Sequence, residues 1–150
     1  MAADALSGSF REDTHVLPMR VYYEDTDAGG VVYHANYLRF AERARTEMMR
    51  ALGAEHTAML GESGVAFTVR RCEADFILPA RLDDTLEVCS RITHVGGASL
   101  RVEQIVRRDG ADLARLGLKL ACLDRQGRPV RLPDQVRAAI ATLSTYRQDG

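Results

Sequence analysis

Residues 21–52 have the sequence VYYEDTDAGGVVYHANYLRFAERARTEMMRAL, and this stretch says most about the fold. It begins with β-branched and aromatic residues, Val21 to Tyr23, which favour a strand. It ends with apolar residues at three- and four-residue steps, which predict a helix over residues 35–52 with a broad buried face. Gly29 and Gly30 let the chain turn sharply between the two, because glycine adopts positive φ and lets a ligand approach the backbone. The pattern predicts a site between a strand and a helix.

Four strand patterns follow this helix. They lie at residues 65–78, 85–94, 99–108 and 112–123. Within residues 99–108 one face is mainly apolar and the other mainly charged, as in a sheet that is covered on one side. Asp109-Gly110 predicts a hairpin turn, and Pro133 opens a short helix that extends to Leu143.

One long helix followed by an antiparallel meander predicts an α+β fold in which the sheet wraps around the helix. The 150 residues, of which 46% are hydrophobic and 27% are charged, fit a single globular domain. We expect that domain to span residues 16–145, with a flexible N-terminal tail over residues 1–15 and a short C-terminal tail over residues 146–150.

Charge and cysteine content narrow the class of protein. The chain has 20 Lys and Arg against 21 Asp and Glu, so its net charge of -1 gives no general attraction to nucleic acid or to an anionic membrane. No window approaches the roughly 18 apolar residues of a membrane span. The three cysteines, an odd number with no close pair, favour a reducing compartment, the cytoplasm, over disulfides or a metal site.

The acidic loop invites two binding hypotheses that its spacing rejects. Asp25 and Asp27 begin like a calcium loop, but Gly29 then stands at loop position five and Asn36 at position twelve, where oxygen ligands are needed. The glycine pair lacks the pattern of a phosphate-binding loop. A carboxylate beside the positive end of a helix is instead a catalytic arrangement, so we expect neither a metal nor a cofactor.

The loop resembles the Asp-containing signature of the 4-hydroxybenzoyl-CoA thioesterase family of the hotdog superfamily, and most closely its bacterial, Tol-Pal-associated, YbgC-like acyl-CoA thioesterases. Residues 42–48, 65–69 and 79–84 also resemble that family, so the likeness covers roughly residues 18–133. The resemblance implies a hotdog fold, in which an antiparallel sheet wraps around one long central helix. It also implies a homotetramer, with a dimer as the minimum and the acyl tunnel at the subunit boundary.

The resemblance implies roles for the loop residues. In the matching motif the second aspartate of Asp-x-Asp is catalytic, which makes Asp27 the general base or the nucleophile. Taken alone, Asp27 would more often form a turn or cap a helix. The His34 backbone N–H becomes the leading donor to the oxyanion, and Gly29, Gly30 and Val31 shape the loop.

His34 departs from the hydroxybenzoyl-specific members, which carry tyrosine at this position, and agrees with the Tol-Pal-associated branch. We therefore expect its imidazole to help orient the catalytic aspartate, the water or the thioester, and count it among the catalytic residues. The weaker candidates for substrate binding are Tyr33, Asn36, Tyr37, Ser99 and Arg71.

Two thiol carriers of the acyl group are consistent with the sequence, coenzyme A and an acyl-carrier protein. Hydroxybenzoyl-specific members carry basic residues before the position that matches Ser99, whereas glycine and alanine stand there in this chain. Phosphate binding must therefore differ, with Arg70, Arg71 and Arg81 as sources of positive charge.

The leading hypothesis is an acyl-CoA thioesterase that hydrolyses a CoA or carrier-protein thioester to free acid and thiol. The alternative is a non-hydrolytic acyl-binding or scaffolding protein of lipid or cell-envelope metabolism. A hotdog dehydratase is a third hypothesis, weakened because its chemistry needs a different acid–base pair. Asp27 favours hydrolysis, since only hydrolysis needs the carboxylate.

Overall fold

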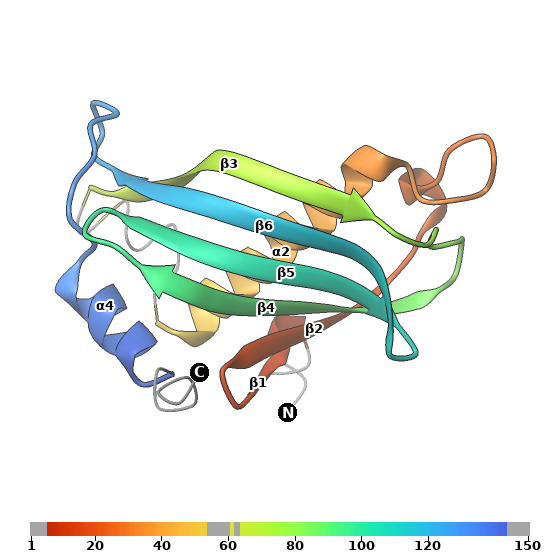
Figure 1. Ribbon diagram of the computed structural model, residues 1–150, viewed down its shortest axis with the longest axis horizontal. Helices are drawn as coiled ribbons and strands as arrows, with labels where there is room; N and C mark the ends of the chain where they lie inside the picture. Colours follow the sequence, from red (N-terminus) through yellow and green to blue (C-terminus); the bar gives the residue numbers. More distant parts are fainter. Residues whose placement is uncertain (1–5, 54–60, 62–63, 144–150) are drawn as a thin grey trace.

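The computed structural model describes residues 6–53, 61 and 64–143. Its described part has two layers, an antiparallel six-stranded sheet and a long helix, α2, behind it (Figure 1). The order of strands across the sheet is β1-β2-β4-β5-β6-β3. The elements are β1 (Ser9–Arg11), β2 (Thr14–Arg20), the 3-10 turn η1 (Tyr23–Asp25), α2 (His34–Ala51), β3 (Ala66–Phe76), β4 (Thr85–Val95), β5 (Ser99–Arg108), β6 (Ala111–Leu123) and α4 (Asp134–Ala141).

The main elements follow the sequence pattern closely, and the α+β class is confirmed. The long helix begins one residue before the expected range and ends one residue before its end. The four strand patterns correspond to β3, β4, β5 and β6. The expected hairpin turn is formed by Asp109 and Gly110, both at positive φ (51° and 81°), which suits the tight turn between β5 and β6.

Two expectations at the N-terminal end are wrong. Residues 9–15, assigned to a tail, form β1 and the start of β2, because their backbone pairs with neighbouring strands. The strand expected at Val21 to Tyr23 lies earlier, at Thr14–Arg20. Its ladder stops because the Tyr22 N–H donates to the Asp25 carboxylate at 2.9 Å, a local bond that competes with strand pairing. Residues 146–150, the expected C-terminal tail, lie outside the described residues.

The core lies between α2 and the inner face of the sheet. On β5 the inward side chains are all buried, as the alternation predicts; they are Leu100, Val102, Gln104 and Val106. They pack against apolar residues of the helix, among them Phe40, Ala44 and Met48. Helix α2 packs chiefly on β2, β4 and β5. This leaves the inner side of β3 less covered, where Val69 and Phe76 are 45% and 49% exposed.

The short helix α4 lies at the end of the sheet that carries the β4–β5 turn (Figure 1). The Arg137 guanidinium donates to the carbonyl oxygens of Gly96 and Gly97, both at 3.0 Å, in the β4–β5 turn. No helix among the described residues has the length and apolar character needed to cross a membrane.

The fully buried side chain of His15 on β2 makes the fold sensitive to pH. Its Nε2–H donates to the Ser7 carbonyl oxygen at 2.7 Å. Its Nδ1 is buried without a hydrogen-bond partner among the described residues. Burial lowers the pKa of His15 below its ordinary value of 6.5, although the bond to Ser7 opposes this. The unfolded chain therefore takes up a proton that the fold resists.

We expect the free energy of unfolding to fall as the pH drops below 6.5, because only the unfolded state then binds the proton readily. His15→Gln cannot titrate and should lose less stability than wild type between about pH 7.5 and about pH 5. Urea denaturation at both pH values measures this. His94→Gln removes an exposed imidazole and should behave as wild type. Equal acid sensitivity in wild type and His15→Gln would contradict the assignment.

Candidate active site

The loop between η1 and α2 is a closed turn. The Asp27 N–H donates to the Val31 carbonyl oxygen at 2.8 Å, and the Gly30 N–H donates back to the Asp27 carbonyl oxygen at 3.0 Å. Thr26 pairs with Val32 just outside this turn. Gly30 has a φ of 79°, a conformation in which side chains other than glycine are strained. The loop is therefore held by its own backbone.

The Asp27 carboxylate takes part in the turn and remains available for chemistry. Its Oδ1 accepts the Gly29 N–H at 2.8 Å and lies 3.4 Å from the Val31 nitrogen. Its Oδ2 has no partner within the part of the chain that the structure describes, and the side chain is exposed. A Cβ on Gly29 would lie 3.2 Å from Oδ1, a tight contact that a larger residue would impose on the carboxylate. Asp27 thus fills the turn-forming role without losing a free oxygen.

Helix α2 begins at His34, two residues after the pair formed by Thr26 and Val32. Because the chain returns there alongside its own start, the N-terminus of α2 lies at the same end of the molecule as Asp27. Tyr33 precedes the helix without a side-chain cap bond. The first backbone N–H groups, that of His34 included, therefore remain available to an anion. The ring of His34 lies 4.6 Å from that of Tyr33 and 5.9 Å from that of Phe76.

The buried Asp25 side chain holds the two ends of the loop together through hydrogen bonds. Its side chain is only 3% exposed. Its Oδ2 accepts the Tyr22 N–H at 2.9 Å, and its Oδ1 accepts the Asn36 amide at 2.9 Å. The Asn36 amide therefore links the first turn of α2 to η1. Its substrate-binding role stays a prediction, whereas this bracing contact is in the structure.

A second brace comes from the segment between β3 and β4. The Val32 N–H donates to the Ala80 carbonyl oxygen at 2.8 Å, and the Ala80 N–H donates to the Tyr37 hydroxyl at 3.0 Å. This segment is in turn held by Asp84, which accepts the Arg108 guanidinium at 2.6 Å. Sequence reasoning gave Asp84 and Arg108 no role. The only signal for Asp84 was the family likeness of residues 79–84, and there was none for Arg108.

Burial raises the pKa of the Asp84 carboxyl, but bonds from the Arg81 N–H and the Arg108 guanidinium outweigh it and bring that pKa below its ordinary value. The carboxylate is therefore ionised at neutral pH. It keeps the segment next to the loop fixed by charge-assisted hydrogen bonds.

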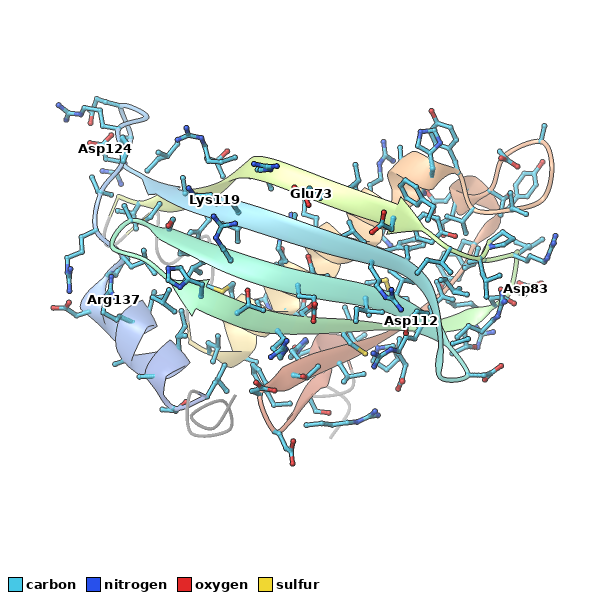
Figure 2. All side chains as sticks on the ribbon, viewed as in Figure 1. Glu73, Asp83, Asp112, Lys119, Asp124 and Arg137 are labelled. Atoms are coloured by element: carbon cyan, nitrogen blue, oxygen red, sulfur yellow. The ribbon has the colours of Figure 1, made fainter. Side chains whose placement is uncertain are left out.

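Ser99 and Arg71 do not meet the other site residues within one chain. They line a groove of about 400 Å³ on the outer face of the sheet, together with Lys119. The 11 residues of β4 separate Ser99 from the loop, a length of about 36 Å, whereas Arg71 lies midway along β3 on the outer face. Figure 2 shows Lys119 and Asp83 near opposite ends of the sheet. The Arg71 guanidinium pairs with Glu73 at 2.7 Å.

The loop therefore supplies a free carboxylate oxygen, and the helix N-terminus that follows it lies at the same end of the molecule. These are a base or nucleophile and an anion-stabilising pole, the two needs of acyl transfer. Among the described residues, no three His, Cys, Asp or Glu side chains gather as a possible metal site.

Residues 29–114 match the family model described as the thioesterase superfamily. The acyl-CoA thioesterase YbgC of Haemophilus influenzae is 46% identical over 124 residues, covering 82% of this chain and 91% of that protein. The acyl-CoA thioester hydrolase YbgC of Escherichia coli O6:H1 is 46% identical over 123 residues, covering 81% and 91%. The crystal structure of a probable thioesterase from Bartonella henselae has a TM-score of 0.78 at 38% identity and covers 80% of this chain and 99% of that chain. The expected hotdog fold is thereby confirmed.

The contact between Asp25 and Asn36 should be measurable as a coupling energy. Asn36→Ala leaves the buried carboxylate short of a donor and should lower the free energy of unfolding by about 1–3 kcal/mol. Asp25→Ala combined with Asn36→Ala should cost less than the sum of the two single changes. Urea denaturation measures all three variants. Gln126→Ala, which removes an exposed amide, should cost no more than about 0.5 kcal/mol. Fully additive losses for Asp25 and Asn36 would contradict the brace.

Proposed function

The chain belongs to the thioesterase superfamily, and from that premise we propose that it is an acyl-CoA thioesterase in which Asp27 is the catalytic carboxylate. The observation that carries this proposal is the free Asp27 oxygen in the loop that leads into the N-terminus of α2. The two relatives that are 46% identical carry names of acyl-CoA thioester hydrolases, which supports the same reaction for this chain.

In this reaction the thioester carbon gains an oxygen and loses its sulfur. Asp27 either takes a proton from the attacking water or attacks the carbonyl itself to give an anhydride that water then opens. In both routes the C–S bond breaks, the thiolate leaves and is protonated, and the acid is released. Both routes use the same carboxylate, so the loop geometry serves either one.

The carbonyl oxygen becomes negative in both routes and needs a donor. The His34 backbone N–H at the first position of α2 is our candidate, supported by the positive end of the helix dipole. Gly29, Gly30 and Val31 keep the loop narrow beside it. We expect the His34 imidazole to orient the water or the thioester and the exposed Tyr33 ring to contact the substrate; the substrate-binding role of the buried Tyr37 stays a prediction.

We propose that the working enzyme is at least a dimer, and a homotetramer in full. Strand β3 ends the sheet with an unpaired edge, and Val69 and Phe76 on its inner side are 45% and 49% exposed. Exposed strand edges and apolar patches of this kind favour association. A second chain beside β3 would close the acyl tunnel and bring its own outer groove to the first chain's loop.

In this arrangement the active site is shared between two chains. Asp27 of one chain cleaves the thioester, and Arg71 and Ser99 of the other chain contact its thiol carrier. The carrier is coenzyme A or an acyl-carrier protein. Cys72, Cys89 and Cys122 all hold free thiols, which supports action in the cytoplasm. A functional link to the Tol-Pal system follows only from the family branch that the motifs resemble.

Asp27→Asn should abolish turnover, because an amide accepts the Gly29 N–H but cannot act as base or nucleophile. We expect kcat to fall by roughly 10²- to 10⁴-fold while acyl binding and oligomeric mass stay unchanged. Thiol release from short, medium and long acyl-CoA thioesters and from 4-hydroxybenzoyl-CoA measures it. Asp109→Asn, in the β5–β6 turn, is the matched control. Wild type that binds these acyl groups without cleaving them would instead support the non-hydrolytic acyl-binding function.

A pair of substitutions at His34 separates its backbone from its side chain. His34→Ala keeps the N–H, whereas His34→Pro removes it at the one helical position that favours proline. Tyr33 already has the extended conformation that precedes proline, with φ -61° and ψ 133°. We expect kcat of His34→Pro to lie roughly 10²- to 10³-fold below that of His34→Ala. Equal kcat values in two folded variants would exclude this N–H as the oxyanion donor.

A further inference from the structure

A groove of about 550 Å³ lies between α2 and the inner side of β3. Its apolar wall includes Met48 and Met49 of the helix and Phe67 of the strand. At the other end of the same strand, the Phe76 ring lies 5.9 Å from the ring of His34 at the start of the helix. The two elements therefore lie side by side with opposite chain directions, and the groove lies further along the line that starts at His34.

This groove contains a buried positive charge. Arg45 of α2 lines it and is only 9% exposed. Its Nη1 donates to the Gln104 side-chain oxygen at 3.0 Å, which is a neutral partner. Within the part of the chain that the structure describes, Nε and Nη2 have no hydrogen-bond partner and the guanidinium has no ion-pair partner. A buried charge without a counter-charge is costly, so the groove favours an anion.

The titratable groups next to Arg45 do not supply that anion. Glu42 also lines the groove, and its charge opposes the lowering of the Arg45 pKa that burial causes. The Glu42 side chain is exposed, however, where solvent and salt screen its charge. Cys72 on β3 is the other neighbour, and burial raises the pKa of its thiol above the ordinary value, so it is neutral at pH 7.

The guanidinium lies at a defined distance from the loop. The Gln104 amide binds both the Arg45 guanidinium and the Ala41 carbonyl oxygen, so the guanidinium lies within one turn of residue 41. Residue 41 follows His34 by about 10 Å along the helix axis. A zigzag carbon chain with bonds of about 1.5 Å advances about 1.3 Å per bond, so about eight carbons span this length.

We propose that Arg45 is a specificity-determining residue that binds a carboxylate at the far end of the acyl group. The preferred substrates are then thioesters of dicarboxylic acids with roughly eight to ten carbons. This inference deepens the proposed function and rests on it, because it places the thioester carbonyl at the His34 N–H. The acyl chain then lies along the inner side of β3, and its far carboxylate accepts from Nε and Nη2 of Arg45 as a bidentate pair.

Three other occupants compete for this position. A long unsubstituted chain suits the apolar wall beyond Arg45, but its methylene groups would cover the guanidinium without neutralising it. A terminal hydroxyl accepts a hydrogen bond but brings no charge. An acidic side chain of another copy would neutralise Arg45 permanently and leave no preference among substrates. Charge complementarity and the distance from His34 favour the substrate carboxylate.

A substrate panel tests the proposal with the intact enzyme. The CoA monothioester of octanedioic acid is compared with octanoyl-CoA and with the methyl ester of the same dicarboxylic thioester, which has a similar shape but no charge. We expect kcat/KM for the acid to exceed that for either neutral form by roughly 10- to 100-fold, the effect of a hydrogen bond between charged groups. The preference should peak at about eight to ten carbons in a series from about six to about twelve.

Substitutions on α2 assign the preference to one side chain. Arg45→Met removes the charge, and it also breaks the bond to Gln104. The measured quantity is therefore the acid-to-ester ratio of kcat/KM within each variant, which does not depend on the fraction of folded enzyme. This ratio should fall to about 1 in Arg45→Met, and Arg45→Lys should restore part of it. Arg43→Met is the matched control, because Arg43 lies on the side of α2 that faces β2, and it should keep the wild-type ratio.

Equal kcat/KM values for acid and ester in wild type would overturn the proposal, as would a wild-type preference for a long unsubstituted chain. An undiminished ratio in Arg45→Met would overturn it too. Equal wild-type values together with a lower molar mass of Arg45→Met in sedimentation velocity would assign the cation to another copy instead. Hydrolysis of none of the thioesters would contradict the proposed reaction. The acid-to-ester ratio of dissociation constants, measured by calorimetry, would then decide the role of Arg45 separately.

Discussion

The position of α2 on the sheet is the constraint on which the site depends. Apolar burial holds the helix there, but apolar contact alone allows it to slide. The fully buried Gln104 on β5 removes that freedom. Its amide donates to the Ala41 carbonyl oxygen at 2.9 Å and to the Ser90 hydroxyl at 2.8 Å, and it accepts the Arg45 guanidinium at 3.0 Å. Breaking this network would leave buried polar groups unpaired, so the helix start is fixed by hydrogen bonds far from it.

Asp27 forms a turn and still keeps one carboxylate oxygen free for its proposed reaction. The turn uses Oδ1, and the backbone bonds between Asp27 and Val31 hold the carboxylate in one orientation. The second oxygen is left outside the turn. An aspartate free of the turn would lose side-chain entropy each time it met the substrate. The structural role of this residue therefore supports its proposed catalytic role, because the turn preorganises the group that would react.

The spacing of apolar residues in the sequence predicted those elements whose position depends on interactions between residues close in the chain. The spacing of apolar residues placed α2 to within one residue at each end, and the alternation on β5 placed its buried face. The sequence pattern failed at β1, which forms by backbone pairing with β2. It also failed at the end of β2, where the Asp25 side chain takes up the Tyr22 N–H. The brace from Tyr37 to Ala80 joins residues 43 apart, which no periodicity reveals. Arg71 and Ser99 were grouped with the loop by family likeness, yet the length of β4 separates Ser99 from it and Arg71 lies on the outer face of the sheet.

The single described chain leaves apolar and charged side chains exposed on the two faces of its sheet. On the inner face α2 covers β2, β4 and β5 but leaves the apolar side of β3 exposed. On the outer face Arg71, Lys119 and Arg101 lie in register on three neighbouring strands. In the proposed assembly, another copy covers the inner side of β3 and brings its outer groove to the loop of this chain.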